Sequence, residues 1–180
     1  MIILDRPYVS DLLAERLQRL RTPVLRNEVS EEVARRYDLE LVDPAEFAAR
    51  ANAHSYPPVY TSSEDAIGWI AKNLGPSGLP GRVDMLKNKL HFRRMIEEEH
   101  PGFFYASIDA DALHHLDPSE LPKPFIVKPA VGFFSVAVRK VESDEAWPEA
   151  LRSIEEDLSN FDGVYPGQVF DPGKFIIEEC

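Results

Sequence analysis

Short apolar runs alternate with helical patterns through the first half of the chain. The apolar runs predict strands at Met1–Asp5, Pro23–Arg26, Leu39–Val42 and Pro58–Thr61. Between them, helical spacing predicts helices at Val9–Leu20, from Ser30, from Asp43-Pro44 and from Ser62 to Leu74. Repeated strand–helix alternation predicts a parallel sheet with helices on its faces.

Capping residues support two of these helices. Ser30 is predicted as an N-cap, with glutamates in the following turn where the helix dipole favours carboxylates. Asp43 is predicted to cap the next helix, with Pro44 at its first position and Glu46 as the capping-box partner.

The second half of the chain has a different pattern. The glycine- and proline-rich run Gly75–Gly81 marks the end of the first sheet, and Asn88 is predicted to cap a helix that reaches about Glu99. The remaining elements are predicted as strands at Phe103–Ile108, Pro124–Pro129, Phe134–Val141 and Phe175–Cys180, a helix from Ser143 to Leu158 and a loop at Asn160–Gly173. We therefore predict an α/β domain over residues 1–84 and a second domain over 85–180. In the second domain, a helical linker (85–120) leads to a small α+β antiparallel unit (121–180).

Composition narrows the classes of partner. The 180 residues carry a net charge of −11, which disfavours binding to nucleic acid and to anionic membranes. The single cysteine excludes an intramolecular disulfide and fits a reducing compartment. The N-terminus lacks the basic and long apolar segments of a signal peptide, so we expect a cytoplasmic protein.

Lys128 is the main candidate for chemistry. It lies near the end of an apolar, β-branched strand and is followed by a short loop that contains Gly132. An ammonium group beside a turn with free backbone N–H groups suits a polyphosphate. The alternative is a lysine of an edge strand that only extends to solvent.

These segments resemble the nucleotide-binding half of an ATP-grasp enzyme. The family pattern has a lysine that opens a helix (here Lys89), then a strand lysine (Lys128), a phosphate loop, and a strand that ends in paired acidic residues (Glu178 and Glu179). The resemblance covers roughly residue 85 to the end of the chain. It implies that residues 1–84 form a Rossmann-like pre-ATP-grasp domain and residues 121–180 the lid subdomain, with Cys180 at the adenine hinge.

The resemblance also implies roles for individual residues. Lys89, Lys128 and the loop residues Gly132 and Ser135 would bind phosphates. Ile126 and Ile176 would pack on adenine, Glu178 would accept a hydrogen bond from its amino group, and Glu179 and Cys180 would contribute backbone groups. The loop departs from the family pattern because Gly132 is its only glycine and two phenylalanines follow, which reduces backbone freedom near a phosphate.

By the same resemblance, the chain is the N-terminal part of a ligase that uses ATP to join a small carboxylate to an amine or a thiol. The reaction would pass through an acyl phosphate, with Mg²⁺ bridging the phosphate oxygens. The pre-ATP-grasp domain would help to hold the carboxylate near Asp5–Tyr8. We expect the metal ligands beyond Cys180, and therefore a fragment of a longer protein that is inactive alone. We assign no catalytic and no metal-binding residue within it. A homodimer is compatible with this function.

Two other functions remain open at this point. The glycine-poor loop and the missing metal ligands fit a non-catalytic nucleotide-binding or assembly module. The same pattern also fits a two-unit α/β protein that binds neither nucleotide nor metal.

Overall fold

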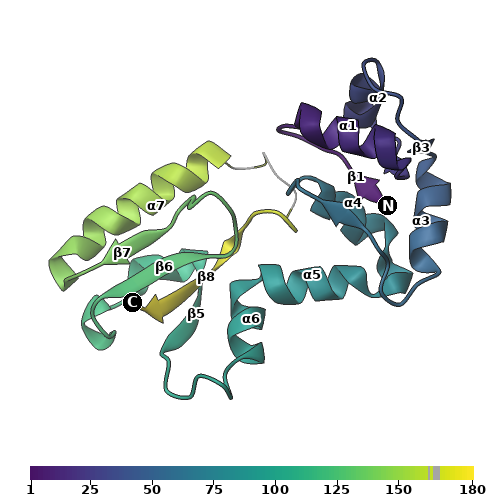
Figure 1. The fold of residues 1–180 in the computed structure, drawn as a ribbon. Coiled ribbons are helices and arrows are strands. Elements are labelled where there is room, and N and C mark those ends of the chain that lie inside the picture. Colours follow the sequence, from purple (N-terminus) through teal and green to yellow (C-terminus); the bar gives the residue numbers. More distant parts are fainter. Residues whose placement is uncertain (162, 164–166) are drawn as a thin grey trace. The chain divides into compact units, whose positions relative to one another are not determined.

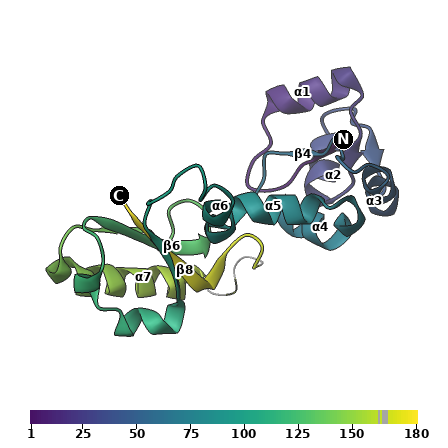
Figure 2. The same ribbon diagram turned by 90° about the horizontal axis from the view of Figure 1, so that it is seen from below.

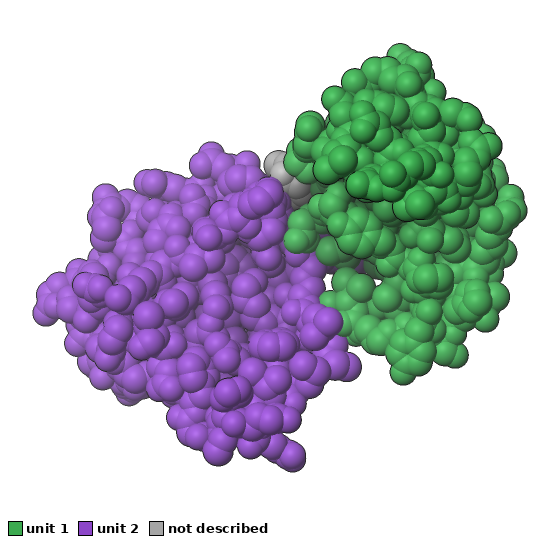
Figure 3. Space-filling model, in the orientation of Figure 1, with its two compact units in different colours: residues 1–83 green, residues 84–180 purple. Residues whose placement is uncertain are grey.

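The chain folds into two compact units, Met1–Val83 and Asp84–Cys180 (Figure 3). The computed structural model describes residues 1–161, 163 and 167–180. Each unit has its own four-stranded sheet and its own hydrophobic core. No helix in the described residues is long and apolar enough to cross a membrane.

Unit 1 is a parallel α/β structure, as the sequence pattern predicts. Its strands are β1 (Ile2–Ile3), β2 (Val24–Leu25), β3 (Leu41–Val42) and β4 (Tyr60–Thr61), in the spatial order β3-β2-β1-β4. Its helices are α1 (Asp11–Leu20), α2 (Glu28–Ala34), α3 (Pro44–Asn52) and α4 (Ala66–Asn73) (Figure 1). Helices α1, α2 and α3 each connect one strand to the next, and α4 follows β4.

Helices cover both faces of this sheet, and successive side chains of β1 pack against them in turn. Ile2 and Leu4 pack with residues of α1 and α2, among them Leu17 and Val33. Ile3 points the other way and packs with Phe47 of α3 and with α4. Strands β1 and β2 are therefore buried on both faces, which explains why all their residues are apolar.

The N-cap of α2 differs from the prediction. Asn27, not Ser30, caps this helix: its Oδ1 accepts a hydrogen bond from the Ser30 N–H at 2.8 Å. Ser30 reciprocates through its Oγ, which accepts from the Asn27 N–H at 2.8 Å. Both residue types are good caps, and Asn27 has a further role because its Nδ2 donates to the Leu4 carbonyl at 2.7 Å.

The start of α3 is confirmed in part. Asp43 accepts from the Ala45 N–H at 2.9 Å and Pro44 is the first helical residue. The prediction of a capping box was wrong, because Glu46 pairs along the helix with Arg50 instead of reaching back. Helix α4 begins at Ala66, later than predicted, after a turn in which Ser63 Oγ accepts from the Asp65 N–H.

Unit 2 contains an antiparallel sheet with one long helix across a face (Figures 1 and 2). The strands are β5 (Tyr105–Asp109), β6 (Phe125–Val131), β7 (Arg139–Val141) and β8 (Asp171–Glu179), in the order β5-β8-β6-β7. The helices are α6 (Lys89–Met95) and α7 (Trp147–Phe161), and α5 (Leu79–Lys87) spans the boundary between the units. Short 3₁₀ turns lie at Gly75–Ser77, Ala110–His115, Pro118–Glu120 and Asp144–Ala146.

Several boundaries in unit 2 differ from the prediction. Strand β7 begins at Arg139, not at Phe134, because Phe134, Ser135 and Ala137 have positive φ angles that no strand accommodates. Helix α6 ends at Met95 rather than near Glu99. The predicted loop at 160–173 is shorter, since α7 extends to Phe161 and β8 begins at Asp171; part of it lies outside the described residues.

The cap of α2 gives a test of the fold of unit 1. We expect Asn27→Ala to lower its free energy of unfolding by about 1–2 kcal/mol, because the cap and the bond to the Leu4 carbonyl are both lost. Urea unfolding followed by Trp69 fluorescence measures this, in a Trp147→Phe background that leaves Trp69 as the one tryptophan. The control Asn27→Asp keeps the capping oxygen and should lose less. Equal losses in the two variants would contradict the capping role.

Candidate functional site

One face of the unit 2 sheet carries most of the residues predicted from the sequence. Antiparallel register places Ile126 opposite Glu178, and Lys128 opposite Ile176. Because opposed residues in a sheet point to the same face, these four side chains share one surface. Their neighbours in sequence, such as Val127, point the other way into the core under α7.

Glu178 is the centre of this face. Its side chain is only 5% exposed and forms ion pairs with Lys128 of β6 and Arg93 of α6. Arg93 Nε donates to Glu178 Oε2 at 2.8 Å, whereas the Lys128 ammonium lies on Oε1. Each carboxylate oxygen therefore has its own cation, and the network joins β8 to a neighbouring strand and to a helix.

Electrostatics keeps this buried carboxylate charged. Burial alone raises the pKa of Glu178, but the hydrogen bonds and charges of Arg93 and Lys128 outweigh burial. The net effect lowers the pKa of Glu178 below its ordinary value of 4.5. At neutral pH the network therefore holds one negative and two positive charges.

Lys89 reaches the same region from the start of α6. Asn88 caps this helix, since its Oδ1 accepts from the Leu90 N–H at 3.1 Å. The Lys89 ammonium donates to the Pro129 carbonyl at 3.0 Å, next to the loop that follows β6. Lys89 and Lys128 line a cavity of about 280 Å³ together with Pro129, Gly132, Phe133, Phe134, Ser135, Val136 and Val138. Both predicted lysines thus lie beside the predicted loop.

The loop adopts its shape without help from glycine. Phe134, Ser135 and Ala137 have φ angles of 47°, 58° and 54°, and such left-handed conformations cost a non-glycine residue about 1–2 kcal/mol each. Gly132 has no positive φ angle. Asp157 of α7 holds the end of the loop, because its Oδ2 accepts from the Ala137 N–H at 2.9 Å. The loop therefore bends at residues other than glycine, and α7 holds the bend at Ala137.

Two backbone donors remain available in this loop. Within the described part of the chain, the N–H groups of Phe134 and Ser135 donate to no acceptor, whereas those of Val136 and Val138 donate to carbonyls inside the loop. Successive free backbone N–H groups in a turn form an anion-binding concavity. The loop thus offers an anion two N–H groups beside two lysines.

The other predicted residues differ in what they offer. Ile126 is partly exposed on the sheet face, whereas Ile176 is fully buried beneath Leu90 of α6. By register, Glu179 points to the opposite face from Glu178. The N–H groups of Glu179 and Cys180 already donate to the carbonyls of Phe104 and Pro124, so only their carbonyl oxygens remain for a ligand.

Sequence reasoning missed Arg93. It lies four residues after Lys89 on α6, and residues at this spacing share one face of a helix. This spacing could have indicated that Arg93 faces the sheet together with Lys89. Its partner Glu178 is 85 residues away, which no local pattern reveals.

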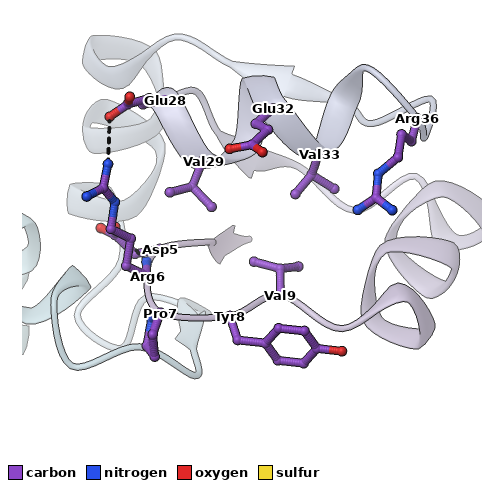
Figure 4. Close-up of a pocket in the computed structure, with 10 residues that line it drawn as sticks. All are labelled: Asp5, Arg6, Pro7, Tyr8, Val9, Glu28, Val29, Glu32, Val33 and Arg36. Carbon is purple, nitrogen blue, oxygen red and sulfur yellow. Dashed lines mark hydrogen bonds and ion pairs between the residues drawn. The ribbon is translucent and has the colours of Figure 1, made fainter.

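A second cavity, of about 360 Å³, lies in unit 1 beside the loop that the sequence analysis assigned to a carboxylate (Figure 4). It is lined by Asp5, Arg6, Pro7, Tyr8, Val9, Glu28, Val29, Glu32, Val33 and Arg36. Its two arginines already have acidic partners, since Arg6 pairs with Glu28 and Arg36 with Asp11, both at 3.4 Å. The carboxylate site near Asp5–Tyr8 therefore stays a prediction.

Metal ligands are not gathered in the described residues. They contain no group of three or more His, Cys, Asp or Glu side chains that could hold an ion. His114, which lies close to Asp109 and Asp111 in the sequence, pairs with Glu155 of α7 instead. The described residues do not fit a Mg²⁺ site, and we derive no step through this metal.

The C-terminal part of the chain has a family match. Residues 121–180 match the family model of the ATP-grasp domain. A search of curated proteins gave no match. Among solved structures, the L-amino acid ligase from Bacillus licheniformis is similar over 99% of this chain, with a TM-score of 0.62 and 18% sequence identity.

Two further solved structures are similar over 99% of the chain. The biotin carboxylase from Campylobacter jejuni, in a complex with β,γ-ATP, has a TM-score of 0.52 at 14% identity. An N5-carboxyaminoimidazole ribonucleotide synthetase, in its ADP complex, has a TM-score of 0.51 at 16% identity. The chain spans 46%, 44% and 46% of the ligase, the carboxylase and the synthetase, which is just under half of each. At these identities the similarity establishes the fold, which is that of the N-terminal part of ATP-grasp enzymes.

The charge of Glu178 can be tested through the pH dependence of stability. Because the pKa of Glu178 is lowered by folding, its contribution is complete above about pH 4.5 and is lost as the pH falls through the folded pKa. Glu178→Gln should therefore destabilise unit 2 by about 1–3 kcal/mol at pH 7, and the difference from the wild type should shrink toward pH 3. Urea unfolding at both pH values, followed by Trp147 fluorescence in a Trp69→Phe background, measures it.

A surface glutamate of the same unit provides the control for this test. Glu155→Gln alters an exposed ion pair with His114 and should cost less than about 0.5 kcal/mol at pH 7. A difference between Glu178→Gln and wild type that stays constant from pH 7 to pH 3 would contradict the charged state of Glu178.

Proposed function

We propose, from the match of residues 121–180 to the ATP-grasp domain, that the face of the unit 2 sheet opposite α7 binds the polyphosphate of ATP. One observation carries the proposal: Lys89, Lys128 and the loop after β6 line the same cavity. Ammonium groups and free backbone N–H groups are the donors that phosphate oxygens use. The net charge of −11 does not oppose this, because the cations are concentrated locally at the site.

The adenine is proposed to lie between β6 and the end of β8. Ile126 offers a partly exposed apolar side chain on this face for the adenine ring to pack on. The carbonyl oxygens of Glu179 and Cys180 would accept hydrogen bonds from the adenine amino group. The Glu178 carboxylate is occupied by two cations, so its main role is to hold Lys128 and α6 in place.

The reaction we propose for the whole protein is the ATP-dependent joining of a carboxylate to an amine or a thiol. ATP supplies the phosphoryl group that activates the carboxylate. In this chain, Lys89 and Lys128 would orient the phosphates and balance the negative charge that builds up on them during transfer. The chain spans just under half of the similar ligase.

A non-catalytic nucleotide-binding module is the second candidate. It is favoured by the glycine-poor loop after β6, in which Phe134, Ser135 and Ala137 take left-handed conformations. Measuring ADP formation from ATP with the whole protein, with amines and small carboxylates as substrates, separates the two. Substrate-dependent turnover supports the ligase, whereas binding without turnover under any condition supports the module.

Lysine substitutions test the phosphate site. We expect Lys128→Ala to weaken ADP binding about 10- to 100-fold, since a charge-assisted hydrogen bond contributes about 1.5–3 kcal/mol. Lys89→Ala should have a similar effect, and isothermal titration calorimetry with ADP measures both. Lys123→Ala is the matched control, because Lys123 also belongs to unit 2 and also pairs with a carboxylate, that of Asp144.

The control also defines the contradicting result. Lys123 pairs with Asp144 and lies over the ring of Phe125, a core residue under α7, so its loss should leave ADP affinity within about twofold. Equal affinities in all three variants and the wild type would overturn the proposed site. Circular dichroism of each variant confirms that a loss of binding is not a loss of folding.

A further inference from the structure

Arg93 holds the buried carboxylate from the side opposite Lys128. The Arg93 guanidinium is 25% exposed and lies over the Phe103 ring, with its Cζ atom 4.1 Å from the ring centroid. This stacking fixes the plane of the guanidinium while Nε donates to Glu178 Oε2. Arg93 therefore contributes a positioned, permanent positive charge.

Lys128 has two competing partners in the proposed function. In this structure its ammonium lies on Glu178 Oε1, and its side chain also lines the cavity beside the loop. A phosphate in that cavity would draw the ammonium away from Oε1. Glu178 would then stay buried but lose one of its two cations. A buried carboxylate without a cation strongly destabilises the fold, so another cation must compensate its charge.

We propose that Arg93 is a positioning residue that compensates Glu178 and so allows Lys128 to exchange between Glu178 and a nucleotide phosphate. This inference rests on the proposed function. Arg93 itself stays on Glu178 throughout and makes no contact with the nucleotide. Its effect on binding is indirect: it lowers the cost of releasing Lys128.

The geometry of the guanidinium suits this role better than an ammonium would. In this structure Arg93 uses Nε on one carboxylate oxygen. Once Lys128 leaves Oε1, an Nη group of the same planar fork can donate to it and complete a bidentate pair. A lysine at position 93 could supply the charge but not the second, parallel hydrogen bond.

The test is ADP titration calorimetry on the wild type and on variants of Arg93 and of its neighbour Arg94. Arg93→Ala should weaken ADP binding about tenfold, because Lys128 becomes the single counterion of Glu178 and is held there. Arg93→Lys, which keeps the charge, should recover part of the affinity. Arg94→Ala, at the exposed neighbouring position on α6, is the matched control and should bind ADP like the wild type.

A double substitution separates positioning from a general structural role. In a Glu178→Gln background no charged partner retains Lys128, so adding Arg93→Ala should leave ADP affinity unchanged. A purely structural role of Arg93 predicts the opposite result: the loss on Arg93→Ala persists in the Glu178→Gln background and follows the drop in melting temperature. If Arg93→Ala does not fold, Arg93→Lys in both backgrounds gives the same comparison with a smaller expected loss.

The outcomes distinguish this inference from the proposed function. If the wild type binds no ADP, or if Lys128→Ala binds as well as the wild type, both are overturned. If Lys128→Ala weakens binding and Arg93→Ala does not, the phosphate site stands and the role of Arg93 is overturned. If both weaken binding and the Arg93 effect disappears in the Glu178→Gln background, both are supported.

Discussion

A carboxylate buried in a sheet stays charged only when cations lie beside it, and the site in unit 2 is organised around this constraint. Glu178 at the end of β8 meets it with Lys128 from β6 and Arg93 from α6. The two pairs connect a strand and a helix to the same point. They also place the Lys128 ammonium at the edge of a cavity, where it can bind a ligand as well as Glu178.

The hydrophobic core makes this arrangement possible by occupying only one side of the sheet with the long helix. Phe125, Val127 and Ile177 pack under α7, so the alternate residues of β6 and β8 face the other way. The core contacts with α6 on that second face are few, chiefly Leu90 on Ile176 and Ala130. On this face, the ion pairs of Glu178 with Lys128 and Arg93 take the place of part of the apolar packing. The cavity beside Lys128 leaves space for a ligand.

Much of this could be predicted from the sequence because it depends on local pattern. The apolar runs predicted the strands that carry Ile126, Lys128 and Glu178, and Asn88 marked the start of the helix that presents Lys89. The role of Arg93 could not be predicted, because its partner is 85 residues away. Nor could the shape of the loop, since its left-handed residues are not glycines and one of them, Ala137, is held by Asp157 of α7. The sequence also left the cap of α2 undecided, because Asn27 and Ser30 are both good caps. The hydrogen bond to the Leu4 carbonyl favours Asn27.

The most direct test of the account is an NMR titration of the ¹⁵N-labelled protein with ADP, which follows the backbone amides and the lysine ammonium groups together. The account predicts that perturbed amides gather at Lys89, in the loop after β6 and at the end of β8, and that the Lys128 ammonium signal shifts as it leaves Glu178. Perturbation confined to the cavity of unit 1, or a Lys128 signal that does not change while ADP binds, would contradict it.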